Sequence, residues 1–140
     1  MSEWIGITDD LAACHALRRL VFIEEQGVSE ADEMDDLDDQ AIHLLATVDG
    51  VPVGTARLIR KGETGKIGRV CVVKSARGTG LGARLMQASV DHFRATPGIT
   101  RAYLSAQTHA LGFYESLGFL AYGEEYPDAG IPHRDMELRF

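Results

Sequence analysis

Apolar residues recur along the chain at two spacings, one typical of helices and one typical of strands. Near the start they recur every three or four positions and predict a helix over residues 9–26, which Thr8 or Asp9 can cap and Gly27 can end. The positions are Leu11, Cys14, Leu17, Leu20 and Val21. An acidic stretch follows, which we expect to be a short helix or loop.

The middle of the chain has the pattern of a three-stranded meander. The strand-like segments are residues 42–48, 53–60 and 66–73. Asp49-Gly50 between the first two is a strong hairpin signal, and residues 61–65 form a second glycine-rich turn.

The second half of the chain is expected to hold two helices and three strands. We expect a helix over residues 80–94, a strand over 99–105, a short helix over 108–117, and closing strands over 119–124 and 134–140 with a loop at 126–133. This order predicts a mixed α/β, or α+β, layered fold rather than an alternating βα chain. The length of 140 residues fits a single domain, residues 1–140.

Charge is unevenly distributed. Residues 24–39 hold nine acids and no Lys or Arg, whereas residues 57–84 hold eight bases and one acid, in a chain of net charge -7. The basic centre suits a phosphorylated ligand, and the acidic stretch suits a cationic one. The alternative for both is a solvated protein face. The balance disfavours nucleic-acid binding.

The sequence gives little support for a disulfide, a metal site or a membrane span. Cys14 and Cys71 have neither metal-ligand nor disulfide spacing, and we expect both to be reduced core residues. Residues 32–38 lack the glycine of a calcium loop, so no metal is expected. No apolar run is long enough to span a membrane and the start is not a signal peptide, so we expect a cytoplasmic protein without membrane partners.

A glycine-rich turn carries the most informative chemistry. Residues 77–82, RGTGLG, lie between a predicted strand and a predicted helix. Glycines allow backbone N–H groups to converge on an anion at a helix N-terminus, and Lys74, Arg77 and Arg84 add positive charge. The spacing fits neither the dinucleotide fingerprint nor the P-loop. The alternative is a turn that serves only tight strand–helix packing.

Two motifs resemble signatures of the GNAT superfamily of N-acetyltransferases. Arg77-x-x-Gly80-x-Gly82 resembles the first, and residues 110–119, ALGFYESLGF, resemble the second. Residues 21–27 and 129–133 further resemble the ElaA-like branch. The resemblance implies a GNAT-type acyl-CoA N-acyltransferase fold, with a central, mostly antiparallel, splayed sheet flanked by helices.

The resemblance also implies a site for acetyl-CoA. Backbone groups of the strand before the turn would bind the pantetheine arm and polarise the thioester carbonyl, and the turn would bind the pyrophosphate. The implied cofactor-binding residues are Val70, Cys71, Val72, Arg77, Gly78, Thr79, Gly80, Leu81, Gly82, Ala83, Gln107 and Phe113. Gln107 stands where many members have Asn. Tyr114 matches the tyrosine that would protonate the departing CoA thiolate.

The acceptor side is less defined. An amine must lose a proton to attack, and Glu25, His43 and His133 are the candidate bases. Gln26 and His133 are expected to contact the acceptor, a primary amine of a small molecule or peptide, which the acidic stretch would attract if it is cationic. We expect direct attack in a ternary complex. Alternatives are an acyl-CoA-binding sensor without turnover and an acyl-homoserine-lactone synthase-like enzyme; a homodimer is left open.

Overall fold

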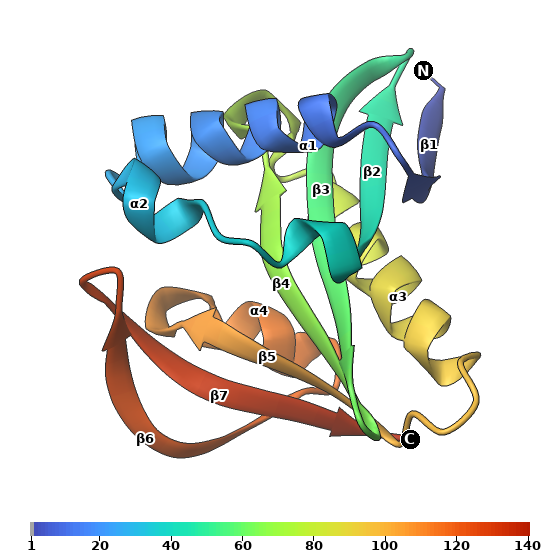
Figure 1. The fold of residues 1–140 in the computed structure, drawn as a ribbon, viewed down its shortest axis with the longest axis vertical. Coiled ribbons are helices and arrows are strands. Elements are labelled where there is room, and N and C mark those ends of the chain that lie inside the picture. The colour runs from blue at the N-terminus through green and yellow to red at the C-terminus, as the bar shows by residue number, and fades with distance from the viewer. Residues whose placement is uncertain (1) are drawn as a thin grey trace.

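A single twisted sheet forms the centre of the computed structural model, which describes residues 2–140 (Figure 1). Its seven strands lie in the order β1-β2-β3-β4-β5-β7-β6. They are β1 (Glu3–Thr8), β2 (Ile42–Val48), β3 (Val51–Lys61), β4 (Thr64–Val72), β5 (Arg101–Gln107), β6 (Leu120–Asp128) and β7 (Ile131–Arg139). Neighbouring strands are antiparallel except β4 and β5, which run parallel.

Helices cover both faces of the sheet (Figure 1). On one face lie α1 (Leu11–Arg18), a π-helical continuation (Arg19–Glu25) and α2 (Glu30–Glu33); on the other lie α3 (Leu81–Arg94) and α4 (Leu111–Ser116). Three short 3-10 turns are Asp38–Gln40, Lys74–Ala76 and Thr108–Ala110. The main core packs α3 and Phe119 against the sheet, and a smaller cluster packs α1 against Leu45 and Cys71. Within residues 2–140, no helix has the length and hydrophobicity needed to cross a membrane.

The sheet is split between β4 and β5. These strands pair only from Thr64 to Lys66, opposite Arg101 to Tyr103, and then diverge. Beyond the split, Arg69 has a φ of 51° inside β4, and the β3–β4 register shifts at that point. A bulge of this kind changes which face the following side chains occupy. Ile67 and Val70, three residues apart, therefore both pack against the α3 core. The predicted splayed, mostly antiparallel sheet is confirmed.

Several predicted elements differ from the structure. The edge strand β1 (Glu3–Thr8) was not predicted, because it is short, holds a glycine and leaves Trp4 and Ile7 about half exposed. The closing strands run through the predicted loop, and only Ala129 and Gly130, with φ of 52° and 75°, make the turn. Such αL residues are typical of two-residue hairpins.

The first helix also differs in register from the prediction. It begins at Leu11 and widens into a π-helix from Arg19 to Glu25. Cys14, Leu17, Arg18 and Val21 form its buried face, so Leu20, one of the apolar positions of the predicted helix, is 46% exposed, whereas Arg18 is 2% exposed. A charged residue thus occupies a position in the interior that the apolar pattern did not assign to it.

Candidate functional site

The glycine turn has the geometry expected of an anion site. Gly78 and Gly80 have φ of 78° and 82°, and Gly80 directly precedes α3. Among the described residues, the backbone N–H groups of residues 78–83 have no hydrogen-bond acceptor. A side chain at Gly82 would come within 3.6 Å of Phe113 and 3.9 Å of Val72. The turn therefore presents free donors at a helix N-terminus, close to the two signature segments.

The arginines of the turn are engaged with distant acids. Arg77 donates through Nη2 to Glu25 Oε2 at 2.8 Å and through Nε to the Val72 carbonyl at 3.0 Å. Arg84 forms a two-bond ion pair with Glu3. The hydrogen bonds from Arg77 lower the pKa of Glu25 below its usual value. A carboxylate held in this way is a weak proton acceptor, which disfavours Glu25 as the base in this arrangement.

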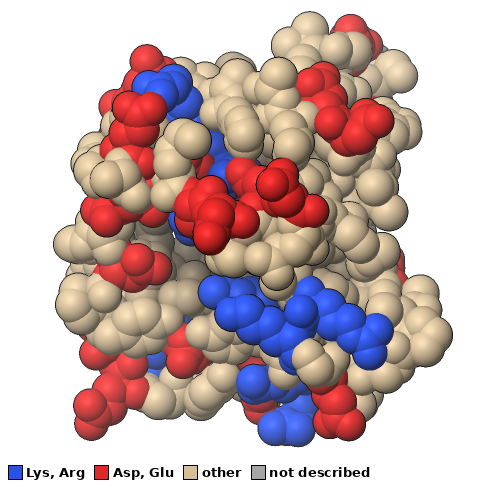
Figure 2. Space-filling view, viewed as in Figure 1, with Lys and Arg blue, Asp and Glu red and all other residues tan. Residues whose placement is uncertain are grey.

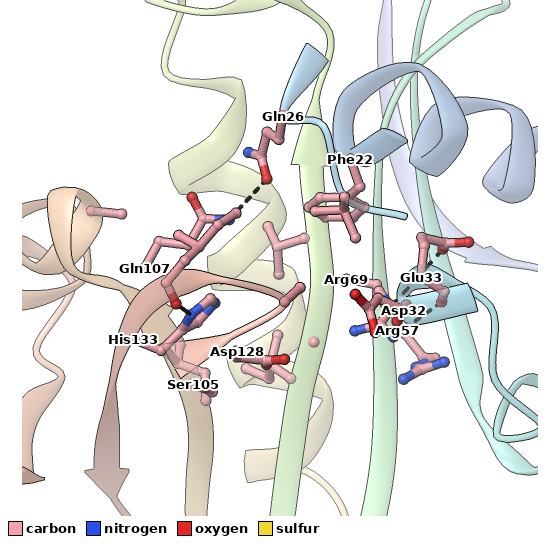
Figure 3. A pocket seen from close by; sticks show the side chains of 18 of the residues that line it. Phe22, Gln26, Asp32, Glu33, Arg57, Arg69, Ser105, Gln107, Asp128 and His133 are labelled. Atoms are coloured by element: carbon pink, nitrogen blue, oxygen red, sulfur yellow. Dashed lines mark hydrogen bonds and ion pairs between the residues drawn. The ribbon is translucent and has the colours of Figure 1, made fainter. Parts of the chain in front are cut away.

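A cavity of about 270 Å³ passes through the split between β4 and β5. Its lining combines residues from both faces of the sheet: Ile67, Leu104 and Tyr114 belong to the side of the α3 core, and Arg57 and Ser105 to the opposite side. Figure 3 shows Gln107, His133 and Ser105 on one side of β4, and Arg69, Asp32 and Glu33 on the other. The diverging strands thus create a passage between the two halves of the molecule.

Tyr114 lines the cavity from α4. Its ring packs edge-on against Phe113 and Phe119, with centroids 5.1 and 6.3 Å away. Burial raises the pKa of Tyr114 to about 12. Within residues 2–140 its hydroxyl has no hydrogen-bond partner. Tyr114 therefore stays protonated, with its O–H group available to a ligand in the cavity.

His133 lines the cavity from β7. Its Nδ1 lies 2.6 Å from the Ile131 carbonyl, which can only accept, so Nδ1 carries the proton. This bond fixes the tautomer and leaves a lone pair on Nε2. The ring stacks on Tyr126 at a centroid distance of 6.3 Å, and Asp135 accepts a 2.6 Å hydrogen bond from the Tyr126 hydroxyl. His133 is thus a fixed and nearly buried proton acceptor.

Two glutamines predicted to contact ligands meet across the cavity. Gln107 of β5 donates from Nε2 to Gln26 Oε1 at 2.9 Å (Figure 3). His109 Nε2 lies 2.6 Å from Gln107 Oε1. Gln26 is just beyond the π-helix and is far from Gln107 in sequence. The bridge joins the first helix to the far half of the sheet at the cavity wall.

His43 is not part of this site. It is 5% exposed, does not line the cavity, and bonds through Nε2 to the Asp38 carbonyl at 3.0 Å. The 3-10 turn Asp38–Gln40 thereby covers it. The structure therefore places the histidine outside the reacting centre, and the prediction of a catalytic role at this position loses its geometric basis.

Three carboxylates of the acidic stretch pair with arginines, two of which belong to the basic centre. Buried Arg18 contacts Glu33 at 2.8 Å and Asp38 at 3.0 Å. The remaining contacts are Arg57 with Asp35 at 2.7 Å and Asp38 at 3.2 Å, and Arg69 with Asp35 at 3.3 Å. We call these six side chains the arginine–carboxylate network. Burial opposes ionisation of Asp38, but hydrogen bonds from Arg18 and other partners hold its pKa well below the usual range.

The network corrects two expectations. Three of the acids expected to attract a cation are instead neutralised by arginines, although other acids remain exposed over the coil before β2, above a band of Lys and Arg (Figure 2). Arg57 and Arg69, counted in a basic centre for a phosphorylated ligand, bind these acids and not the glycine turn. Sequence reasoning missed the network because its members come from four separate segments: α1, the acidic stretch, β3 and β4.

Two predictions about the cysteines hold. Cys14 and Cys71 are both buried and free. Burial raises the pKa of Cys71 to about 12, so its thiol is a poor nucleophile at neutral pH. Among the described residues, no cluster of His, Cys, Asp and Glu side chains has the arrangement of a metal site.

Comparisons with known proteins agree with this geometry. The acetyltransferase (GNAT) domain family matches residues 20–140. The N-acetyltransferase YjcF of Bacillus subtilis (strain 168) is 38% identical over 121 residues, covering 86% of each chain. Protein ElaA of Escherichia coli (strain K12) is 35% identical over 150 aligned positions, covering 97% of this chain and 95% of its own.

Solved structures show the same fold. An acyl-CoA N-acyltransferase from Pseudomonas aeruginosa superposes with a TM-score of 0.83 at 33% identity, covering 97% of both chains. A Bacillus subtilis acetyltransferase in complex with CoA, 16% identical, has a TM-score of 0.76 over 99% of both chains and shares the fold alone. With its splayed sheet, both signature motifs and these relatives, including ElaA, the chain belongs to the GNAT family of acetyltransferases.

Proposed function

We propose that the protein transfers an acetyl group from acetyl-CoA to a primary amine by direct attack in a ternary complex. One observation carries this proposal: the cavity through the split sheet has Tyr114 on one side and the Nε2 lone pair of His133 on the other. An acid for the leaving group and a base for the nucleophile are the two groups that aminolysis of a thioester needs.

Acetyl-CoA would enter from the glycine turn. The free N–H groups of residues 78–83 would bind its pyrophosphate, with Arg77 and Arg84 alongside. The pantetheine arm would lie along the edge of β4 that faces β5 and is unpaired there, at Val70 to Val72, near Phe113 and Gln107. A structure of the same fold contains CoA, which supports the proposal that this fold can hold the cofactor.

The reaction would proceed in balanced steps. His133 Nε2 takes a proton from the amine, and the amine nitrogen attacks the thioester carbonyl carbon while a β4 backbone N–H stabilises the oxyanion. The C–S bond then breaks as Tyr114 donates its proton to sulfur. The nitrogen gives up its second proton, which reaches the Tyr114 phenolate through water, and His133 releases the first proton to solvent, leaving an N-acetyl amine and free CoA. Because burial makes a Tyr114 phenolate costly, proton donation and C–S cleavage are expected to be concerted.

Release of CoA thiol over a panel of amines tests the proposal. His133→Asn should lower kcat by about 100-fold or more. Its residual activity should rise with pH, because only the amine that solvent has deprotonated can then attack. Tyr114→Phe should lower kcat with little change in acetyl-CoA binding. His92→Gln, on α3 away from the cavity, is the matched control. A His133→Asn enzyme with wild-type kcat and pH profile would disprove the role of that histidine.

A further inference from the structure

Lys66 is a cation of the cavity wall that the steps above do not use. It is the last residue of β4 that pairs with β5, opposite Tyr103, and its side chain lines the cavity where the strands begin to separate. It is partly buried and, within residues 2–140, has no carboxylate within ion-pair distance. A partly buried ammonium without a counter-ion is unusual in a folded protein and calls for a partner.

The neighbours of Lys66 do not supply one. In the arginine–carboxylate network three guanidinium groups face three carboxylates, so the acids of the network are already paired. Asp32 and Asp128 also line the cavity, but among the described residues neither forms an ion pair with Lys66. Even so, Nε of Arg57 and Nε of Arg69 are buried without an acceptor. Burial first, and then the charges of Lys61, Arg57 and Arg69, lower the pKa of Lys66, and the charge of Asp128 opposes them. This part of the wall therefore presents cationic hydrogen-bond donors that have no acceptor among the described residues.

The pyrophosphate of CoA is too far away to be this partner. Lys66 and Val72 are six residues apart on β4, which is roughly 20 Å along an extended strand. The glycine turn lies beyond Val72. The negative group that Lys66 could bind must therefore belong to the molecule in the other half of the cavity, where the acceptor amine has to be.

The two sides of that half differ in character. Lys66 and Arg69 project from β4, whereas His133 and Asp128 line it from β7 and the tip of the β6–β7 hairpin. A base and an acid on the hairpin side suit an amine. A cationic wall opposite suits a carboxylate, which ammonium and guanidinium groups bind through charge-assisted hydrogen bonds.

We propose that Lys66, with Arg69 beside it, forms an anion-binding subsite, and that the acceptor is an amine that carries a carboxylate. This inference rests on the proposed acetyl transfer for its orientation, with the amine at His133 and the carboxylate at Lys66. It adds a carboxylate to the primary-amine acceptor expected from the sequence. Asp128, which lines the hairpin side together with His133, favours the ammonium end of the same molecule.

Matched acceptors that differ only in charge test the subsite. The acids are glycine, β-alanine, γ-aminobutyrate and ε-aminocaproate; each is compared with its own amide, and γ-aminobutyrate also with the diamine putrescine. With the full chain and acetyl-CoA, kcat/KM for the best acid should exceed that for its amide by about tenfold or more, in line with a charge-assisted bond. Equal use of acid and amide, or preference for putrescine, would overturn the subsite.

Variants identify the group responsible. Lys66→Gln should reduce the acid-to-amide preference to about twofold or less, and Lys66→Arg should retain most of it. Lys61→Gln is the matched control. Lys61 is exposed and does not line the cavity, and its substitution removes the same charge nearby, so this variant should keep the preference. A preference that survives Lys66→Gln would assign recognition to another group and refute the subsite.

Calorimetry on the CoA-bound protein separates this inference from the proposed reaction. Binding of the acids that weakens in Lys66→Gln, without turnover of any amine, would support the subsite and contradict the proposed transfer to these acceptors. Turnover of amines without a carboxylate preference would support the proposed transfer and contradict the subsite. Absence of both binding and turnover would overturn the subsite, because it predicts that the acids bind.

Discussion

Residues 77–82 and residues 30–39 are the two most distinctive segments of the sequence, and in the folded protein they behave in opposite ways. The glycine turn keeps its backbone donors free, at the start of α3. The acidic segment places Glu33, Asp35 and Asp38 against three arginines. The first segment remains available to a ligand, whereas much of the second is satisfied within the protein.

The difference reflects what each segment consists of. A turn made of glycines has a conformation set by its own residues, and its N–H groups point outward whatever surrounds it. The role of a carboxylate can be inferred only when its partner is known, and the partners of this segment come from α1, β3 and β4. Local chemistry can therefore be inferred from sequence when the backbone supplies it, and much less well when distant side chains do.

The largest expected effect is on stability and comes from the acidic side of the comparison. Arg18→Met removes one partner of Glu33 and Asp38 and should lower the free energy of unfolding by about 3–5 kcal/mol, because it leaves poorly compensated buried carboxylates. The neighbouring Arg19→Met breaks an exposed pair with Glu30 and should cost less than about 1 kcal/mol. Urea unfolding measures both. Equal losses would show that the network is no more than a surface feature.

The glycine turn is expected to affect binding more than stability. Gly80→Val forces a branched side chain into a φ of 82° and within 2.7 Å of Arg84, and should weaken CoA binding by about 100-fold, or ~2.7 kcal/mol. Gly62→Val is the matched control, because Gly62 also has a positive φ but lies in an open turn away from the site. Calorimetry with CoA is the measurement. Undiminished affinity in Gly80→Val would remove the turn from the cofactor site.

Low pH should destabilise the arginine–carboxylate network before it affects the glycine turn. Hydrogen bonds within the network lower the pKa of Asp35 and hold that of Asp38 well below its usual range. Below about pH 4, unfolded carboxyls bind protons that the folded ones do not, so stability present above that pH is lost as pH falls, at about 1.4 kcal/mol per pH unit for each such group.

Urea unfolding at a series of pH values checks this dependence. Asp35→Asn should give a shallower decline than wild type, because one of the depressed groups is gone. Glu30→Gln, which removes an acid from the exposed pair with Arg19, serves as the control and should keep the wild-type slope. A slope that is identical in Asp35→Asn would mean that its ion pair contributes nothing to acid sensitivity.

The smallest effect is expected at the ion pair between Glu25 and Arg77, which lies beside the glycine turn. Glu25→Gln frees Arg77 and removes a negative charge near the pyrophosphate, so CoA affinity should rise by about twofold to threefold, consistent with a pair of which each side chain is about 40% exposed. Turnover should change by less than about threefold. A loss of turnover by about two orders of magnitude would instead identify Glu25 as the base.

Much of the fold could be predicted from the sequence. Six of the seven strands, α3 and α4 followed from apolar spacing and turn residues, because those patterns report on each segment's own packing. The edge strand β1 and the exact hairpin at Ala129-Gly130 did not, because a half-exposed strand and a tight turn have weak local signals.

The candidate site divided in the same way. Residues 77–83 and Tyr114 were predicted from the two motifs, and His133 from its loop. Lys66, Ser105, Tyr126 and the arginine–carboxylate network have no motif, since what defines them is which distant residues they face. His43 was proposed from its neighbours in sequence, and the Asp38–Gln40 turn that covers it was not foreseen.

The sequence by itself determined the local backbone features of this protein: the glycine turn, the strand before it and the helix that carries Tyr114. Only the tertiary structure decided which charges remain free. Ion pairs form between residues that folding brings together, so Arg57 and Arg69 were committed to acids more than 20 positions away, and Lys66 was left without a partner beside the cavity. The acetyl-CoA side could be inferred from local motifs, whereas the acceptor side depended on the pairing of distant charges.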